Sequence, residues 1–371
     1  MNKKLGCYIL IGQSSSNDHS GIGLKVRNQI AAFNKAGLNF GEYVLSISKS
    51  KLLPILYRMP FTNSYPIWEC ADEFKKVDYI YMRRPFVMNG AMRKVLREVK
   101  KYNPKIKIVV EIPTYPYDAE YETYKAKELL IAKDKYNRMR MKGLVDRYAI
   151  LNDEKEVFGI PTIKIRNGID VDNIHKRNPT HNNNNCLHVC AIAAFKEWHG
   201  YERIIEGLER YYKNGGDRNI VCHFAGDGSA LQDYKKLVKD KGLEDHFVFY
   251  GYVEGKQLDD IYNRCTISLG SFGMYKKKLN LSCDLKSREA VARGIPMVTG
   301  CPTDIFVEGK YKYYLEFAND SSAVDIQKII DFNDEIYRNG EEPVIEDIRR
   351  YAFENVSMDA AMKNVIDYFK E

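Results

Sequence analysis

The most informative stretch of the chain is Asp284-Leu285-Lys286-Ser287-Arg288-Glu289-Ala290-Val291-Ala292-Arg293-Gly294-Ile295-Pro296-Met297-Val298. Its residues predict a loop, then a helix over 287–293 that ends at a glycine, and then a buried strand. A helix N-terminus presents unpaired N–H groups and the positive end of the helix dipole to an anion. Because Glu289 lies near that terminus, one hypothesis is a site for a diphosphate and vicinal ribose hydroxyls. The other is an ordinary helix of an α/β sheet.

Short strands alternate with helices along the whole chain, which predicts parallel sheets with helices on both faces. In the first half we expect strands over 5–11, 42–45, 79–81, 106–111, 148–151 and 162–165, and helices over 25–36, 91–102 and 120–142. In the second half we expect strands over 187–192, 221–225, 247–250, 267–269, 297–299 and 313–317, and helices over 201–212, 230–241, 255–264 and 287–293.

The chain has 371 residues, which is more than one ordinary core requires and favours two domains. The polar run 178–185, with asparagine at each of positions 182–185, predicts the linker between them. We therefore expect an N-terminal domain over 1–177 and a C-terminal domain over 178–354, facing each other across a cleft. Apolar residues at helical spacing predict a closing helix within 355–371 that packs back on the N-terminal domain.

Composition and charge narrow the class of protein. No stretch approaches the ~20 apolar residues that cross a bilayer. The eight cysteines are scattered without metal-ligand spacing, which favours reduced thiols in the cytoplasm and no metal site. Residues 1–180 hold 32 Lys and Arg against 19 Asp and Glu, a balance of +13, whereas the remainder holds 25 against 31, a balance of −6. The basic half is suited to an anionic partner.

Turns with glycine follow the predicted strands in both halves. Ser20-Gly21-Ile22-Gly23 follows the first strand and lacks the third glycine of a dinucleotide fingerprint. In the second half, Ala225-Gly226-Asp227-Gly228 and Gly251-Tyr252-Val253 each follow a strand, and Asn167-Gly168-Ile169-Asp170 precedes the linker. Ligands of open parallel sheets bind beyond the carboxyl ends of the strands, where these turns are expected. Each turn by itself is also explained as a tight turn.

A series of segments, taken in their order along the chain, resembles glycosyltransferase family 4. The series consists of the turn 167–170, the basic loop 194–201, the two later glycine turns and the stretch 284–298. The resemblance is to the donor domain of these retaining bacterial enzymes. It covers most of residues 160–300 and, more loosely, the N-terminal domain. It implies the GT-B fold, with two Rossmann-like, doubly wound α/β domains, and a nucleotide-diphosphate sugar donor carrying UDP or GDP. It implies neither a metal nor another cofactor.

The resemblance also implies roles for individual residues. Glu289 would hold the ribose, and Lys196, with His199, would offset the charge of the donor phosphates. Backbone amides at 284–286 would face the diphosphate. The donor-binding set is Gly21, Gly23, His199, Gly226, Asp227, Gly228, Tyr252, Val253, Asp284, Leu285, Lys286 and Glu289, and the catalytic set is Lys196, Glu289 and Glu111.

The chain departs from the family at Leu281, where the resemblance places a first glutamate eight residues before Glu289. Leucine neither binds a sugar hydroxyl nor carries charge, so the sugar transferred, and transfer itself, stay open. Asp284 is an alternative source of a carboxylate. The family's N-terminal histidine has no obvious counterpart, and in its region the acceptor-side candidates are Glu111, Tyr115 and Tyr117.

The positive charge of the first half is most concentrated between residues 83 and 107. The predicted helix 91–102 combines an apolar stripe with cations, which is typical both of an ordinary surface helix and of one that binds a membrane. We assign to the acceptor or the membrane surface Arg83, Arg84, Arg93, Lys94, Arg97, Lys100, Lys101, Tyr115 and Tyr117.

The sequence therefore predicts a hexosyltransferase that acts with retention in cell-surface polysaccharide or capsule biosynthesis. Its expected acceptor is a glycan or a polyprenyl-diphosphate-linked glycan, and its expected location is the cytoplasm, peripheral on the inner face of the plasma membrane. Two alternatives stay open: a non-catalytic binding or scaffold subunit, and a nucleotide-sugar 2-epimerase. Nucleic acid is not expected as a partner, because the basic patch lacks interleaved aromatic residues.

Overall fold

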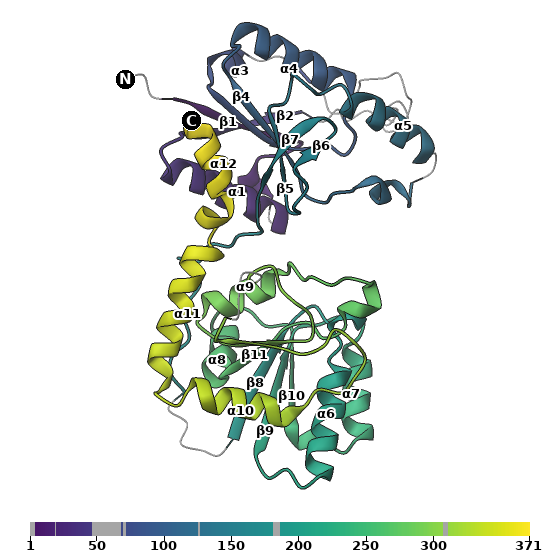
Figure 1. Ribbon diagram of the computed structural model, residues 1–371, viewed down its shortest axis with the longest axis vertical. Helices are drawn as coiled ribbons and strands as arrows, with labels where there is room; N and C mark the ends of the chain where they lie inside the picture. The colour runs from purple at the N-terminus through teal and green to yellow at the C-terminus, as the bar shows by residue number, and fades with distance from the viewer. Residues whose placement is uncertain are drawn as a thin grey trace. The chain divides into compact units, whose positions relative to one another are not determined.

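The protein consists of two α/β units, each described here by itself (Figure 1). The computed structural model describes residues 4–18, 20–46, 68–69, 72–124, 127–180, 186–306 and 311–371. The first unit comprises Met1–Gly168 and Met358–Glu371, and the second comprises Ile169–Ser357. The predicted bound lay at 177/178; residues 169–177 instead group with the second unit. The residues from Met358 onward group with the first unit.

The first unit is built on a sheet with the strand order β2-β1-β3-β4-β5-β7-β6. Neighbouring strands are parallel except for the pair β6 and β7 at one edge. The strands are β1 (Gly6–Ile11), β2 (Phe40–Leu45), β3 (Tyr79–Arg83), β4 (Lys107–Ile112), β5 (Arg147–Ile150), β6 (Glu156–Val157) and β7 (Ile160–Lys164). Parallel strands need crossover connections, and helices supply them.

Helices cover both faces of this sheet because successive residues of each buried strand point to opposite sides. In β3, for example, Ile80 and Met82 join one apolar cluster, whereas Tyr79 and Tyr81 join another. The helices are α1 (Gly21–Lys35), α3 (Asp72–Lys76), α4 (Gly90–Tyr102), α5 (Lys127–Arg138) and α12 (Met358–Lys370), with short 3-10 turns η1 (Ser15–Asn17) and η2 (Asp118–Tyr121).

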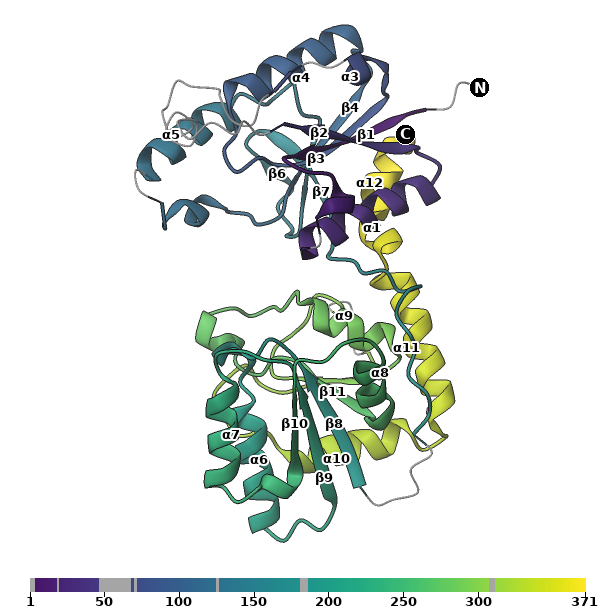
Figure 2. The same ribbon diagram turned by 180° about the vertical axis from the view of Figure 1, so that it is seen from behind.

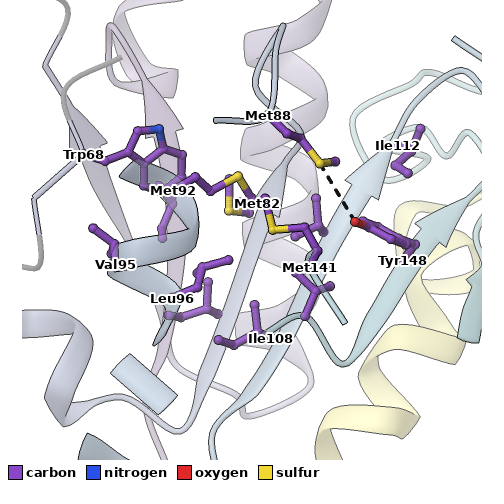
Figure 3. Close-up of a cluster of buried hydrophobic side chains, with 14 of the residues drawn as sticks. Trp68, Met82, Met88, Met92, Val95, Leu96, Ile108, Ile112, Met141 and Tyr148 are labelled. Carbon is purple, nitrogen blue, oxygen red and sulfur yellow. Dashed lines mark hydrogen bonds between the residues drawn. The ribbon is translucent and has the colours of Figure 1, made fainter. Parts of the chain in front are cut away.

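Helix α4 packs one face of the sheet with an apolar stripe at helical spacing (Figure 3). Its Met92, Val95 and Leu96 are buried against sheet residues such as Met82 and Ile108. The helix begins where the Asn89 side chain accepts a hydrogen bond from the amide of Met92, at 2.9 Å. This stripe fixes the rotation of α4, so its basic side chains lie on the opposite face.

Helix α12 returns to the first unit from the far end of the chain and packs beside α1 (Figures 1 and 2). Its apolar residues complete the second face of the sheet. Phe369 is fully buried, with ring centroids at 4.9 Å from Tyr79, 5.6 Å from Phe40 and 6.0 Å from Phe33. The first unit therefore depends on residues that follow the whole second unit in sequence.

The second unit repeats the architecture with the strand order β10-β9-β8-β11-β12-β13, all parallel. Its strands are β8 (Cys186–Ile192), β9 (Asn219–Ala225), β10 (Phe247–Gly251), β11 (Ile267–Leu269), β12 (Met297–Thr299) and β13 (Tyr314–Glu316). Its helices are α6 (Glu202–Lys213), α7 (Leu231–Asp240), α8 (Gly255–Arg264), α9 (Leu285–Ala292), α10 (Ile326–Ile336) and α11 (Glu341–Asn355), with the turns η3 (Glu197–His199), η4 (Glu244–His246) and η5 (Met274–Lys277).

Both sheets have a position where the chain changes direction across the sheet. In the first, the chain passes from β1 to β2 on one side and then to β3 on the other. In the second, β9 and β10 lie on one side of β8, and β11 on the other. Loops at the carboxyl ends of such strand pairs diverge and leave a crevice for a ligand. The expected positions for binding sites are therefore the ends of β1 and β3, and of β8 and β11.

The predicted fold class, two doubly wound α/β domains, is confirmed, and the differences are local. The predicted helix 120–142 is shorter, with α5 preceded by the turn η2. Helices α10 and α11 were not predicted, although both bury apolar residues at helical spacing. Pro343 lies in the first turn of α11, where a missing amide hydrogen costs no helical bond.

Replacing Phe369 with alanine should lower the free energy of unfolding of the first unit by about 3–5 kcal/mol, because the cavity is walled by aromatic rings from α1, β2 and β3. Lys363→Ala on the exposed face of α12 is the matched control, with an expected change within about 0.5 kcal/mol. Denaturant-dependent hydrogen exchange of the β1 and β3 amides measures the free energy of unfolding of the first unit directly. A loss below about 1 kcal/mol for Phe369→Ala would show that α12 does not stabilise this sheet.

Candidate functional site

The carboxyl edge of the second sheet is held together by backbone contacts between loops. The amide of Phe195 donates to the carbonyl of Asp227 at 2.7 Å, and the amide of Gly226 donates to the carbonyl of Gly251 at 2.6 Å. Gly226 and Gly228 have φ of 127° and 150°. A Cβ at Gly226 would lie 1.9 Å from the Ala193 carbonyl oxygen, and one at Gly228 would lie 2.1 Å from that of Phe195. Neither position has room for a side chain.

A second close approach joins the end of η3 to the loop after β11. Gly200 has φ of 66°, and a Cβ there would lie 2.4 Å from the Gly273 nitrogen. The amide of Phe272 donates to the carbonyl of His199 at 2.7 Å. The loops that follow β8 and β11 are therefore joined directly, at the point where the strand order changes direction. Gly226 and Gly228, predicted to lie beside a donor, make room for neighbouring backbone, and their contact with a donor stays a prediction.

Cations gather at this edge. Lys196 and His199 lie at either end of η3, and the amide of Lys196 donates to Nδ1 of His199 at 3.2 Å. Burial, and after it the charge of Lys286, lower the pKa of His199 to about 3, so this imidazole is neutral near pH 7. Lys196 is half-buried and forms no ion pair among the described residues. Lys277, which sequence reasoning missed, lies with its ammonium 4.1 Å from the centroid of the Trp198 ring.

Lys286 is the third lysine at this edge. Its ammonium donates to the Tyr201 hydroxyl at 3.3 Å. Burial lowers the pKa of Lys286 to about 8, although the Asp284 carboxylate opposes the shift. A lysine with this pKa is mostly charged at pH 7 and loses its charge in mildly alkaline solution. An anion at the site would stabilise its charged form.

Helix α9 begins at this cluster with Asp284 as its N-cap. The Asp284 carboxylate accepts hydrogen bonds from the Ser287 amide at 2.7 Å and the Ser282 hydroxyl at 2.5 Å. Burial would raise the pKa of Asp284, but Lys286 and these bonds outweigh it and hold the pKa below its usual value. The carboxylate thus caps the helix, and its suggested substitution for the glutamate missing at Leu281 stays a prediction. The amides of Leu285 and Lys286, in the first turn, have no helical acceptor.

Glu289 lies one turn into α9 and is held by Arg293, one turn further on. The Nε and Nη2 atoms of Arg293 each lie 3.1 Å from Oε1 of Glu289, and Nη1 lies 2.6 Å from Asp259. Oε2 of Glu289 makes no hydrogen bond to a described residue, and the side chain is 31% exposed. The carboxylate is therefore oriented with one oxygen free to accept hydrogen bonds. Arg293 was missed, although its spacing of four from Glu289 is that of a helical ion pair.

Other predicted donor residues have varied positions. Tyr252 is 75% exposed and its hydroxyl donates to Glu254 at 2.8 Å, whereas Val253 is half-buried against an apolar cluster. Asp227 is exposed in the turn after β9. Leu281 is 43% exposed and lies beside the bridge between Ser282 and Thr303. An exposed leucine occupies the position where the resemblance expected a charge.

In the first unit, a pocket of about 720 Å³ lies at the carboxyl ends of β1, β3 and β4. Gly23 lines it and is buried, and a Cβ there would lie 2.1 Å from the Asp18 carbonyl oxygen. Gly21 is exposed and open. The Ser20 side chain already accepts from the amides of Ile22 and Gly23, at 3.2 and 3.3 Å. Sequence reasoning missed the polar wall of this pocket: Gln13, Ser15, Asp18 and Thr114.

Glu111 does not have the surface position that an acceptor-side catalyst requires. It is fully buried, and its carboxylate accepts hydrogen bonds from Lys25 at 2.8 Å, Gln29 at 2.8 Å and the Tyr81 hydroxyl at 2.7 Å. Burial would raise the pKa of Glu111, but the charges of Lys25 and Arg83 outweigh it and keep the pKa below its usual value. The catalytic role predicted for Glu111 is therefore corrected to a structural one.

Arg84 and Tyr117 are likewise structural rather than exposed. The Arg84 guanidinium lies 3.8 Å from the centroid of the Tyr117 ring and pairs with Glu120. Tyr117 is buried, and its hydroxyl donates to Asp134 at 2.7 Å. Tyr115 is half-buried against the same core. Arg83 and Arg84 both line the pocket, and the Arg83 side chain is the more exposed of the two, at 22% against 4%.

On the helix predicted to be basic, some cations contact other side chains and the rest are exposed. Lys100 pairs with Asp146 at 2.7 Å, and Arg93 lies over the Tyr136 ring. Lys94, Arg97 and Lys101 are exposed. Among the described residues no helix is long and apolar enough to cross a bilayer, and no group of three or more His, Cys, Asp or Glu side chains could hold a metal ion.

Comparison with known proteins identifies the second unit. Residues 172–332 match the family model of glycosyl transferases group 1. No curated protein sequence matches the chain. The match includes the strands β8–β12 and the site at the start of α9. The protein thus carries a glycosyl transferases group 1 domain, and by class it is a glycosyltransferase.

Solved structures agree in fold at low identity. A glycosyltransferase from Rickettsia africae is 14% identical, with a TM-score of 0.62 and coverage of 100% of this chain and 98% of that chain. HepE of Anabaena, solved with UDP, is 12% identical, with a TM-score of 0.58 and coverage of 99% and 100%. Sucrose-phosphate synthase of Thermosynechococcus elongatus is 12% identical, with a TM-score of 0.56 and coverage of 99% and 98%. The GT-B fold predicted from the sequence is confirmed.

Substituting Gly228 with alanine should destabilise the second unit by about 2–4 kcal/mol, because the new Cβ meets backbone and the residue has positive φ. Gly242→Ala is the matched control, since Gly242 has φ of 65° but open space around it, and about 1 kcal/mol is expected there from strain alone. Equal losses for the two variants in urea unfolding would contradict the close approach of the two loops.

Proposed function

We propose that the protein transfers a sugar from a nucleoside diphosphate donor and that the donor binds at the start of α9. The observation that carries the proposal is the gathering of Lys196, Lys286 and the free first-turn amides of α9 where the second sheet changes direction. A diphosphate has the charge and the acceptor oxygens that such a site satisfies. Oε2 of Glu289 is the acceptor for the ribose hydroxyls, one turn away.

The chemistry proposed for the site is electrostatic. As the bond between the sugar and the diphosphate breaks, negative charge accumulates on the leaving phosphate. Lys196 is half-buried and unpaired among the described residues, so its ammonium is available to stabilise that charge. Neutral His199 is available as a hydrogen-bond partner rather than as a cation. Retention of anomeric configuration and independence from a bound metal are parts of the proposal.

For the donor, we favour a uridine diphosphate sugar over a guanosine one. HepE, which has the same fold, was solved with UDP and with UDP-glucose. For the acceptor we propose a glycan or a polyprenyl-diphosphate-linked glycan that binds at the pocket of the first unit, beside Arg83. The proposed setting is cell-surface polysaccharide or capsule biosynthesis, in the cytoplasm and peripheral on the inner face of the plasma membrane.

A second candidate function is a binding subunit that holds a nucleotide without transferring a sugar. The exposed Leu281 favours it, because no carboxylate stands where the resemblance expects one to contact the donor. The two candidates differ in turnover: with UDP-glucose and a mixed glycan acceptor, an enzyme releases UDP and a binding subunit releases none.

Calorimetric titration with UDP, GDP and ADP tests the donor site. We expect one nucleotide class to bind, and Glu289→Ala to weaken it by about ten- to a hundredfold through loss of charged hydrogen bonds to the ribose. Glu354→Ala, which removes an exposed glutamate from α11, is the matched control and should bind as wild type does. Absence of binding to all three nucleotides, or an unchanged affinity in Glu289→Ala, would rule out this donor site.

Nucleotide affinity should also fall as pH rises from 7 to 9, because Lys286 loses its proton near pH 8 in the free protein. Below that pH the ammonium is charged and attracts the diphosphate, and above it the attraction is lost. Lys286→Gln should bind more weakly at pH 7 and show a flatter dependence over the same interval. If wild type and Lys286→Gln change in parallel with pH, the lysine does not contact the phosphates.

A further inference from the structure

Helix α5 of the first unit has the reverse of the usual distribution of side chains. Its buried face is mostly polar: beside Leu130, which is 1% exposed, it holds Lys133, Asp134, Asn137 and Arg138, each at most 7% exposed. Its outer side exposes Leu129, Ala132 and Tyr136, and Met139 follows in the turn directly after the helix; Leu129, Tyr136 and Met139 are 43%, 54% and 52% exposed. Glu128 and Lys135 are also exposed on this side. The spacings of three, four and three residues place the four apolar residues on one stripe. Surface helices normally have the opposite arrangement.

The polar face is fixed inward by paired charges. Asp134 accepts hydrogen bonds from the Met88 amide at 2.8 Å and the Tyr117 hydroxyl at 2.7 Å, and its carboxylate lies 3.3 Å from Arg138. Arg138 also pairs with Asp118. Burying these charges without their partners would be costly, so α5 cannot rotate to bring its apolar stripe into the core. The exposure of the stripe is therefore built into the fold.

Cations border the stripe. The guanidinium of Arg140 lies 3.7 Å from the centroid of the Tyr136 ring, and that of Arg93 on α4 lies 5.4 Å from it. These contacts join the outer faces of α4 and α5, which are neighbours in both views (Figures 1 and 2). On α4, Lys94, Arg97 and Lys101 are exposed, because the opposite face of that helix is buried (Figure 3).

We propose that the stripe on α5, with the bordering cations of α4 and α5, docks on an anionic phospholipid bilayer. Leucine and methionine side chains enter the acyl boundary, a tyrosine suits the headgroup level, and arginine and lysine attract anionic headgroups. A second copy of the chain would bring like charges together on the same face, which disfavours a dimer here. This surface would provide the membrane association that is part of the proposed function, and its cellular setting rests on that proposed function.

Vesicle sedimentation of the full chain tests the surface. Wild type should pellet with vesicles of phosphatidylcholine and phosphatidylglycerol in a 7:3 ratio, and much less with phosphatidylcholine alone. Leu129→Ser with Met139→Ser should weaken binding by about tenfold, because two buried apolar side chains are lost. The matched control, Leu24→Ser with Val248→Ser, removes two other exposed apolar residues and should bind as wild type does. Lys94→Gln with Arg97→Gln and Lys101→Gln should abolish the preference for anionic vesicles.

The proposal is overturned if wild type does not prefer the anionic vesicles, or if the Leu129 and Met139 variant binds as tightly as wild type. It is also overturned if wild type is a dimer without vesicles and this variant is a monomer, since a second copy then covers the stripe. UDP binding and thermal unfolding are measured on each variant. Wild type that binds UDP but does not prefer anionic vesicles contradicts only this surface, and wild type that binds those vesicles but no nucleotide contradicts only the donor site.

Discussion

The site of the second unit depends on contacts between backbones at positions that have no space for a side chain. Gly226 and Gly228 allow the turn after β9 to contact the loop after β8, and Gly200 allows that loop to contact the one after β11. Lys196 and His199 are carried on the middle loop, so their positions follow from these contacts. The cluster of charge at the start of α9 exists because three loops are held together without side chains between them.

The first unit is also built on a doubly wound sheet, with a different strand order, and uses its strand ends differently. Its carboxyl edge holds a buried ionic network, in which Glu111 joins Lys25 and Gln29 of α1 to Tyr81 of β3. The network fixes α1 to the sheet beside the pocket, and removal of one partner would leave a buried charge uncompensated. In both units, then, the strand ends position the loops, through glycine contacts in one and through a buried carboxylate in the other.

The periodic features of the sequence predicted the fold well. Alternating apolar runs and turns with glycine predicted nearly every strand and the helix α9, because burial and turn formation depend on local residue type. The helices α10 and α11 were not predicted, although their buried apolar residues have helical spacing. The site was predicted only in part, because burial is a property of tertiary packing. Glu111, Arg84 and Tyr117 carry suitable chemistry in the sequence, but the structure places them in the interior.

Residues that act on another residue were the hardest to predict. Arg293 orients Glu289, and Lys277 contributes to the charge near His199. Arg293 lies within the stretch 284–298 but was given no role there, and Lys277 lies outside every motif that the sequence analysis names. The reversed helix α5 was missed for a related reason. Its apolar stripe has the spacing of a core-facing helix. Only the burial and pairing of Asp134 with Arg138 on the opposite face show that the apolar stripe faces outward.

The most direct test of the donor site is a crystal structure of the protein with UDP. The account predicts the diphosphate at the amides of Leu285 and Lys286, with the ammonium groups of Lys196 and Lys286 in contact and the ribose hydroxyls at Oε2 of Glu289. A nucleotide bound elsewhere in the second unit, or in the pocket of the first unit, would contradict it.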